Sequence, residues 1–353
     1  MDMKPRILMV GPDRKEKGGI ASVVSQYYEH NLCDLIDLKY ISTSSGDTLL
    51  SKYIHYIASL FKCIYNMPFY DILHIHMASR GSYYRKRIII CLAKKVFQKT
   101  VLIHLHGAEF QKFYLEECNR RKKDQIKKTF DMSDGIIALS DEWKKFLSEL
   151  TDSDKICVIH NAVAIQECKQ SYTKNSILFL GRLGKRKGIY DVISILPELI
   201  KEYPDLRLYV AGDGEISRCQ KICKEMNIED YIEFKGWLDR NRIIDLFKEC
   251  SIFVLPSYHE GLPMSMLEAM SHGLAVVVTA VGGIPSVISQ NYNGLLVKAG
   301  DGQALRESID CLLKDKNFCS KIGRQGYATV KEHYSIECHI KQLVNMYMKF
   351  CPK

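Results

Sequence analysis

The stretch PSYHEGLPMSMLEAMSHG, residues 256–273, is the most informative segment of this 353-residue chain. An apolar run at 252–255 precedes it and predicts a buried strand. Gly261 and Pro263 then favour a tight loop, and Pro263 suits the first turn of a helix over 263–271, because the N–H that proline lacks would have no partner there. A strand, a loop and a helix in this order leave free N–H groups and partial positive charge at the loop, which predicts an anion site.

Two carboxylates flank this predicted anion site. Glu260 lies in the loop and Glu268 in the helix, at most about 12 Å apart along a helix axis. This span matches a ligand with hydroxyl-bearing sugars at both ends and phosphates between them, as in a nucleoside diphosphate sugar. A solvated loop carboxylate and a surface helix carboxylate would look the same at this level, so both interpretations stay open here.

Composition sets the broad class. A chain of 353 residues with 46% hydrophobic content favours two domains with separate cores. The 13 cysteines form no CxxC pair, which indicates reduced thiols, and no apolar run approaches the ~20 residues of a membrane span. The start, MDMKPRILMVG, predicts a first strand and not a signal peptide. We therefore expect a cytoplasmic protein.

Positive charge is concentrated in the first half. The net charge is +9, and residues 1–170 carry 26 Lys and Arg against 20 Asp and Glu. Residues 83–99 and 120–128 are basic, and 52–65 add aromatic side chains beside two lysines. A basic amphipathic helix can lie on an anionic leaflet, which predicts contact with the inner face of the plasma membrane, but a core-packed helix with a solvated basic edge is equally compatible. Nucleic acid is disfavoured because no binding motif accompanies the charge.

Strands and helices alternate twice along the chain, which predicts an α/β fold with parallel sheets covered on both faces. The hinge is expected at 161–176, between domains at 1–165 and 166–335. Expected strands lie at 5–10, 35–41, 72–75, 101–104, 135–139, 156–159, 177–180, 206–211, 232–234, 252–255, 275–278 and 295–297. Expected helices include 20–28, 189–201, 215–226, 241–250, 263–271 and 304–313.

Glycines mark further loops between strands and helices. Gly18 and Gly19 open a helix after the first strand, which lets backbone approach a phosphate. The pattern is neither GxGxxG nor a P-loop, which disfavours an NAD-linked enzyme. In the second half, GRLGKRKG at 181–188 places Arg182 and Lys187 at a strand's carboxyl end, where they can hold a diphosphate. Loops at 212–214 and 282–285 open on the same edge, each before an expected helix.

Four histidines alternate at the ends of two expected strands: His74, His76, His104 and His106. Two HxH pairs without cysteine give little support to a zinc site. Ligands of parallel sheets lie beyond the carboxyl ends of strands, so His106 is the histidine expected to face a ligand. A purely structural role for it stays open.

These segments together resemble the retaining glycosyltransferases of family 4. GRLGKRKG, AGDGE, EGLPMSMLEAM, VGGIP and NGLLV carry the resemblance in the second half, and GGIASVV, DILHIHMAS and HLHGAEF carry it less specifically in the first. The resemblance implies the GT-B fold, two Rossmann-like doubly wound domains facing across a cleft. It also implies no cofactor and no metal, and a last helix at 336–353 that packs back on the first domain.

The resemblance also assigns site residues. Arg182 and Lys187 would bind the donor diphosphate, Glu260 the donor sugar, Glu268 the ribose, and His106 would approach the transferred sugar. The wider donor-binding set comprises Gly18, Gly19, Gly181, Gly212, Gly261, Leu262, Pro263, Met264, Leu267 and Glu268. Two departures from the family pattern, Ser286 in place of Glu and Glu109 in place of Asp, leave the diphosphate-holding groups in place.

The expected reaction transfers a hexosyl group from a UDP- or GDP-sugar to a saccharide acceptor with retention, in the biosynthesis of a surface polysaccharide. The first domain would bind the acceptor, for which an undecaprenyl-diphosphate-linked saccharide is preferred, and the second the donor. The alternatives are a sugar-nucleotide epimerase or phosphorylase of the same fold, and a non-catalytic accessory subunit.

Overall fold

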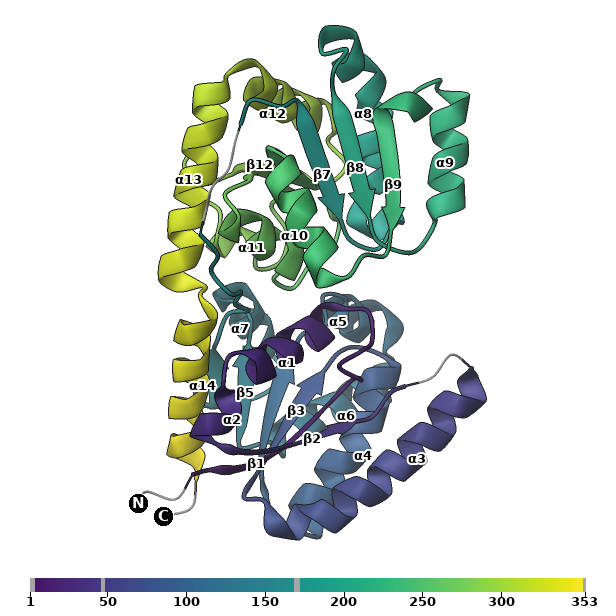
Figure 1. The fold of residues 1–353 in the computed structure, drawn as a ribbon. Helices are drawn as coiled ribbons and strands as arrows, with labels where there is room; N and C mark the ends of the chain where they lie inside the picture. The colour runs from purple at the N-terminus through teal and green to yellow at the C-terminus, as the bar shows by residue number, and fades with distance from the viewer. Residues whose placement is uncertain (1–3, 46–47, 168–171, 352–353) are drawn as a thin grey trace. The chain divides into compact units, whose positions relative to one another are not determined.

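The computed structural model describes residues 4–45, 48–167 and 172–351, and the chain divides into two compact units (Figure 1). The first unit comprises Met1–Ala162 and Ile336–Lys353, and the second comprises Val163–Ser335. The sequence placed this boundary at 165/166 and grouped 336–353 with the first domain. Residues 168–171 of the expected hinge lie outside the described residues.

The first unit is built on a parallel six-stranded sheet of order β2-β1-β3-β4-β5-β6. Its strands are β1 (Arg6–Gly11), β2 (Asp37–Ser42), β3 (Ile72–Met77), β4 (Thr100–Leu105), β5 (Gly135–Ala138) and β6 (Ile156–Val158). Its helices are α1 (Gly19–Glu29), α2 (Leu32–Leu35), α3 (Leu49–Asn66), α4 (Gly81–Lys95), α5 (Phe110–Lys112), α6 (Arg120–Asp131), α7 (Asp141–Ser148) and α14 (Ile336–Phe350).

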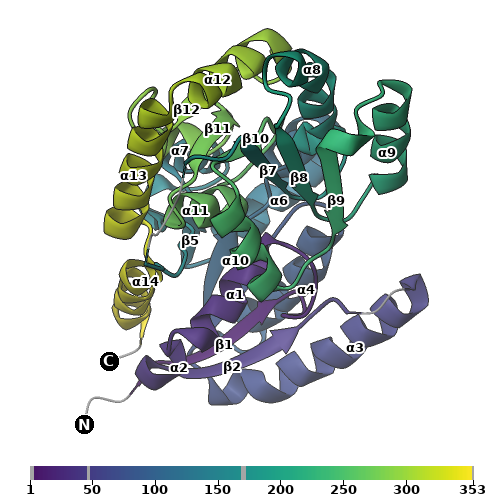
Figure 2. The ribbon, with the colours of Figure 1, turned by 45° about the horizontal axis from the view of Figure 1, so that its top comes forward.

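The second unit has a parallel six-stranded sheet of order β12-β11-β10-β7-β8-β9, of which β7, β8 and β9 lie side by side in Figure 2. Its strands are β7 (Ser176–Leu180), β8 (Arg207–Ala211), β9 (Ile232–Gly236), β10 (Ile252–Leu255), β11 (Ala275–Thr279) and β12 (Leu295–Val297). Its helices are α8 (Ile189–Glu202), α9 (Ile216–Glu225), α10 (Arg240–Glu249), α11 (Met264–Ser271), α12 (Gly302–Lys314) and α13 (Lys316–His333).

Continuous apolar runs form the central strands. Every residue of β3, β10 and β11 is buried, as expected where helices cover both faces of a parallel sheet. Strand order reverses between β1 and β3 in the first sheet and between β7 and β10 in the second. Ligands of open α/β sheets bind beyond the carboxyl ends of strands at such reversals, so the loops after these strands are the place to look for a site.

Several expected elements differ from the structure. The strand expected at 35–41 begins at Asp37, because Leu32–Leu35 forms the short helix α2 after Asn31, which has a left-handed backbone. Pro263 has an extended backbone and caps α11, so the helix begins at Met264 and not at the proline. The glycines at 282–283 lead into a single 3-10 turn, Ile284–Ser286, and not into an α-helix.

The basic helices of the first unit bury their apolar faces. In α4 the buried residues are Tyr83, Lys86, Ile89, Ile90 and Ala93, and in α6 they are Ile126, Thr129 and Phe130. Both helices therefore pack on the core, and α4 leaves Tyr84 and Ile88 38% and 43% exposed. No helix of the described residues combines the length and apolarity that a membrane crossing requires.

Candidate functional site

Backbone hydrogen bonds tie together the loops that follow β7 and β8. The N–H of Gly181 donates to the carbonyl of Ala211 over 3.0 Å. The N–H of Leu183 donates to the carbonyl of Asp213 over 2.6 Å, and Leu183 accepts in turn from the N–H of Glu215 over 3.1 Å. These bonds fix the 181–188 loop against the glycine loop at 212–214.

A second set of hydrogen bonds joins the 181–188 loop to the loops that follow β10 and β11. The N–H of Tyr258 donates to the carbonyl of Arg186 over 2.8 Å, and the guanidinium of Arg186 donates to the carbonyl of His259 over 3.0 Å. The N–H of Gly283 donates to the carbonyl of Gly261 over 2.6 Å. The structure therefore brings together the four glycine-containing loops that the sequence predicted on one edge.

Glycine is sterically required where these loops cross. Gly188 has a φ of +73°, and a Cβ there would lie 2.1 Å from the carbonyl oxygen of Pro256. Gly282 has a φ of +56°, and its Cβ would lie 2.0 Å from the carbonyl oxygen of Glu260. A side chain at either position would push the loops apart, so the glycines explain how the backbones approach so closely.

An ion pair lies at the centre of this loop cluster. The Lys187 ammonium lies 2.6 Å from Glu260 Oε1, and the two side chains are only 13% and 6% exposed. Arg186 lies 3.8 Å from the same oxygen. An ammonium has three N–H donors, so the bond to Glu260 fixes the direction of Lys187 and leaves donors that can bind a ligand.

The other predicted donor-binding residues have different surroundings. Arg182 is exposed and, among the described residues, makes no hydrogen bond or salt bridge, and Glu268 on α11 is partly exposed. The side chains of Leu262, Met264 and Leu267 are buried in the second unit. These apolar residues can therefore serve a ligand only through their backbone, as the first N–H groups of α11 do in an anion site.

In the first unit, the predicted glycines lie between β1 and α1. Gly18 caps α1 with a φ of +151°, a conformation that favours glycine, and Gly19 is the first helical residue. At Gly11, the end of β1, a Cβ would lie 3.5 Å from Cβ of His76, so the first and third strands approach closely at their carboxyl ends.

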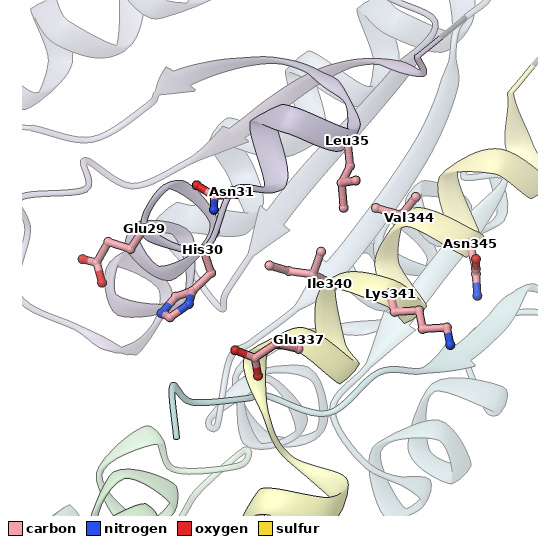
Figure 3. A pocket seen from close by; sticks show the side chains of 9 residues that line it. All are labelled: Glu29, His30, Asn31, Leu35, Glu337, Ile340, Lys341, Val344 and Asn345. Carbon is pink, nitrogen blue, oxygen red and sulfur yellow. The ribbon is translucent and has the colours of Figure 1, made fainter. Parts of the chain in front are cut away.

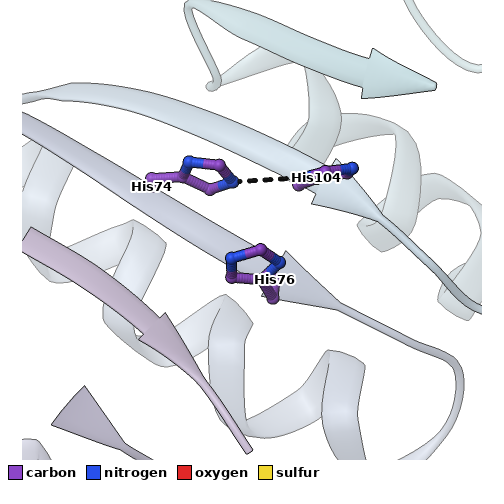
Figure 4. A group of neighbouring side chains, drawn as sticks. All are labelled: His74, His76 and His104. Carbon is purple, nitrogen blue, oxygen red and sulfur yellow. Dashed lines mark hydrogen bonds between the residues drawn. The ribbon is translucent and has the colours of Figure 1, made fainter. Parts of the chain in front are cut away.

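The four histidines of the sequence motif lie together on neighbouring strands. His74 and His76 belong to β3, His104 belongs to β4, and all three are buried (Figure 4). His106 follows β4, is partly exposed, and shares a 2.8 Å hydrogen bond between its Nε2 and Nδ1 of His76. Burial, together with neighbouring histidines, lowers the pKa of His74 and of His106 to about 3. The imidazoles are therefore neutral at pH 7.

The histidine rings of this cluster bond to one another and to Tyr347. One nitrogen from each of His74, His76 and His104 lies within 4.8 Å of the others, and, among the described residues, Nε2 of His76 and Nε2 of His104 have no hydrogen-bond partner. Nε2 of His74 shares a 3.3 Å hydrogen bond with Nδ1 of His104. Nδ1 of His74 shares a second hydrogen bond with the hydroxyl of Tyr347. We call the cluster the histidine network: it consists of two hydrogen-bonded pairs, His74–His104 and His76–His106, whose rings contact one another.

Sequence reasoning missed Tyr27 and His339, whose rings contact His76 and His104 of this network. Tyr27 of α1 shares a 2.8 Å hydrogen bond with Nε2 of His339 on α14, whose Nδ1 donates to the carbonyl of His160 over 2.7 Å. His339 and Tyr347 are eight residues apart and lie on one face of a helix. That spacing was the available signal, and it indicates which face of α14 packs on the first sheet.

A pocket of about 460 Å³ lies in the first unit between the end of α1 and α14 (Figure 3). None of the predicted site residues line it. Its lining residues are Glu29, His30, Asn31, Leu35, Glu337, Ile340, Lys341, Val344 and Asn345. The pocket is at the C-terminal end of α1, away from the glycines that begin the helix, so it plays no part in the candidate site.

Two parallel six-stranded sheets of this order form the GT-B fold of glycosyltransferases. Sucrose-phosphate synthase from Thermosynechococcus elongatus superposes with a TM-score of 0.83 over 98% of this chain and 99% of that one, at 18% identity. HepE of Anabaena, solved in complex with UDP-glucose, superposes with a TM-score of 0.78 over 97% and 99%, at 16% identity. These likenesses establish the fold.

Sequence comparison gives the family of the second unit. Residues 164–329 match the family model described as Glycosyl transferases group 1. The chain is 26% identical over 347 residues to UDP-Gal:alpha-D-GlcNAc-diphosphoundecaprenol alpha-1,3-galactosyltransferase of Escherichia coli, covering 89% of this chain and 86% of that protein. N-acetyl-alpha-D-glucosaminyl L-malate synthase of Bacillus anthracis is 26% identical over 293 residues, 78% and 74% of the two chains. The family model thus covers nearly all of the second unit, and the relatives support the glycosyltransferase class for the chain.

Proposed function

We propose that this protein transfers a hexosyl group from a nucleoside diphosphate sugar to a hydroxyl of a saccharide acceptor, with retention of the anomeric configuration. The observation that carries the proposal is the Lys187–Glu260 pair, held 2.6 Å apart where four glycine loops meet at the strand-order reversal. Cations and free helix N–H groups at that place suit a diphosphate, and carboxylates suit sugar hydroxyls.

The proposed chemistry needs stabilisation of a leaving group. The bond between the anomeric carbon and the diphosphate oxygen breaks, the acceptor oxygen bonds to the same carbon, and the acceptor proton passes to the leaving phosphate. Negative charge grows on the diphosphate during this step, and fixed donors such as Lys187, Arg182 and the N–H groups of α11 stabilise it. Each such donor contributes about 3 kcal/mol to the lowering of the barrier.

The proposed acceptor is a diphosphate-lipid-linked saccharide at the inner face of the plasma membrane, used in the biosynthesis of a surface polysaccharide. Two findings support this choice. The Escherichia coli relative is named for a diphosphoundecaprenol-linked acceptor. The first unit, to which we assign the acceptor, belongs to the more basic half of the chain.

The test combines donor binding with product analysis. A thermal-shift panel of UDP- and GDP-sugars identifies the donor, and NMR of the product with an added acceptor determines the anomeric configuration. Arg182→Ala combined with Lys187→Ala should abolish transfer, while Lys185→Ala, an exposed lysine of the same loop, should retain it. Near-normal transfer by the double variant would refute the site. An epimerised donor formed without acceptor would instead identify an epimerase, and a sugar phosphate product would identify a phosphorylase. Failure to bind any sugar nucleotide would identify an accessory subunit.

A further inference from the structure

Helix α3 exposes more large apolar side chains than any other described helix of the first unit. Tyr56, Ser59 and Cys63 are buried against the unit. On the opposite side, a stripe of large apolar side chains is 59–74% exposed: Leu50, Tyr53, Ile54, Phe61 and Tyr65. Phe69 in the turn after α3 is 57% exposed, and its ring centroid lies 6.0 Å from that of Tyr65. We call these six residues the α3 stripe.

The α3 stripe follows helical geometry. Residues 50, 54, 61 and 65 are separated by four, seven and four positions, so they lie within about 60° of one another around the helix axis. From Leu50 to Tyr65 the stripe extends about 22 Å at 1.5 Å per residue. Figures 1 and 2 both show α3 along the outside of the first unit. An exposed apolar surface of this length indicates an interaction site.

The charges beside the α3 stripe favour an anionic partner. Helix α3 contains no Asp or Glu; of its two exposed lysines, Lys62 lies about 60° around the helix axis from Tyr65, whereas Lys52 lies about 160° from Ile54. Lys99 adds another cation, since its ammonium donates to the carbonyl of Pro68, beside Phe69, over 3.2 Å. The nearest acid after the helix, Asp71, is paired with Arg6 over 2.7 Å.

We infer that α3 binds the surface of an anionic lipid bilayer, inserting its stripe between the headgroups. Tyr and Phe suit the boundary between headgroups and acyl chains, and flanking lysines suit anionic headgroups. Among the described helices of the first unit, α4 exposes only Tyr84 and Ile88, at 38% and 43%, whereas α3 exposes five large apolar side chains and also has exposed lysines. The inference rests on the proposed function for its setting, where the acceptor is lipid-linked, but the binding itself needs neither donor nor acceptor.

The test measures co-sedimentation of the full chain with vesicles in the absence of any sugar substrate. The wild type should bind vesicles of phosphatidylcholine and phosphatidylglycerol, and bind less at high salt or without phosphatidylglycerol. Ile54→Asn combined with Phe61→Asn should lower the partition coefficient about tenfold or more. Tenfold corresponds to about 1.4 kcal/mol, less than the transfer free energy of one fully buried Phe. Lys62→Glu should weaken binding to the anionic vesicles alone.

The matched control replaces apolar side chains of similar exposure elsewhere. Tyr292→Asn combined with Met348→Asn changes residues that are 51% and 52% exposed and should leave vesicle binding unchanged. Equal binding by the α3 variant and the wild type would overturn the inference. So would a concentration-dependent dimer that the α3 variant loses, which would assign the stripe to a second copy of the chain.

Failure of the proposed function is a separate outcome. The α3 variant should still transfer sugar to a water-soluble acceptor analogue at the wild-type rate. Vesicle binding without any transfer by the wild type would refute the proposed function and leave the assignment of α3 standing. Transfer by the wild type without vesicle binding would refute the assignment of α3 and leave the proposed function standing.

Discussion

The Lys187–Glu260 pair offers a direct test of how the candidate site is built. Lys187→Met keeps an unbranched side chain of similar length and removes the ammonium that lies 2.6 Å from Glu260. Glu260 is 6% exposed, so its carboxylate would remain buried without its nearest cation. Losing one partner of a buried pair costs 3–5 kcal/mol in the free energy of unfolding, and the nearby Arg186 places the expected loss at the lower end, about 3 kcal/mol.

Thermal unfolding measures this loss. For a unit of this size, about 3 kcal/mol corresponds to a decrease in Tm of roughly 6–12 °C. Lys187→Met combined with Glu260→Gln removes both charges, so the double variant should be more stable than the sum of the two single effects predicts, by about 2 kcal/mol. Lys185→Met, in the same loop and exposed, should change Tm by less than about 1 °C.

The same variants connect stability to ligand binding. UDP at about 100 times its Kd should stabilise the wild type by about 2.7 kcal/mol, and this gain should be largely lost in Lys187→Met but retained in Lys185→Met. A Lys187→Met variant as stable as the wild type, with additive effects in the cycle, would refute the idea that Glu260 holds Lys187 in place. An unchanged UDP stabilisation in that variant would show that Lys187 does not bind the diphosphate.

Three further expectations follow from particular residues. Burial lowers the pKa of His74 to about 3 and of His339 to about 4. As pH falls below the ordinary pKa of 6.5, these histidines take up protons in the unfolded chain but not in the folded one, so the free energy of unfolding decreases. At pH 5 each loss is about 2 kcal/mol, and His339→Gln should flatten the decline of unfolding free energy measured by urea titration between pH 7 and 5. Gly188→Ala should lower stability by at least ~1–3 kcal/mol and impair donor binding, as calorimetry would show, because its Cβ would lie 2.1 Å from the carbonyl oxygen of Pro256. Glu268→Gln should weaken binding of a ribose nucleotide by about tenfold and of its 2′,3′-dideoxy analogue much less; equal losses would mean that Glu268 does not contact the ribose.

The parallel sheets could be predicted because they are encoded locally. The strands β10 and β11 are short apolar runs between glycines and polar loops, and their burial on both faces gives them that composition. The same local signals placed Lys187 and Glu260 on loops at strand ends, and the structure brings the two residues together. Their roles in binding remain predictions.

Other features depend on contacts between distant parts of the chain and have no local signal. Tyr27 and His339 are 312 positions apart, so no pattern near either residue indicates their hydrogen bond. The apolar residues of α3 appeared in the sequence as one aromatic segment, and only packing decides which of them face solvent. Helix α13 was missed because its apolar positions are few and separated by charged and polar residues.

The two strand-order reversals have different electrostatics, and this difference suits a division of roles. In the second unit, Lys187, Arg186 and Arg182 bring positive charge to the loops, and positive charge there would stabilise the leaving diphosphate of the proposed reaction. In the first unit, burial keeps the histidines neutral, and the pKa of His106 falls to about 3. A protonated imidazole beside an oxocarbenium-like sugar would repel the positive charge that grows on the ring. A neutral imidazole can hydrogen-bond to the sugar without that repulsion, and the bond to His76 fixes its orientation. The buried histidine network therefore has a chemical reason to be neutral if His106 contacts the transferred sugar.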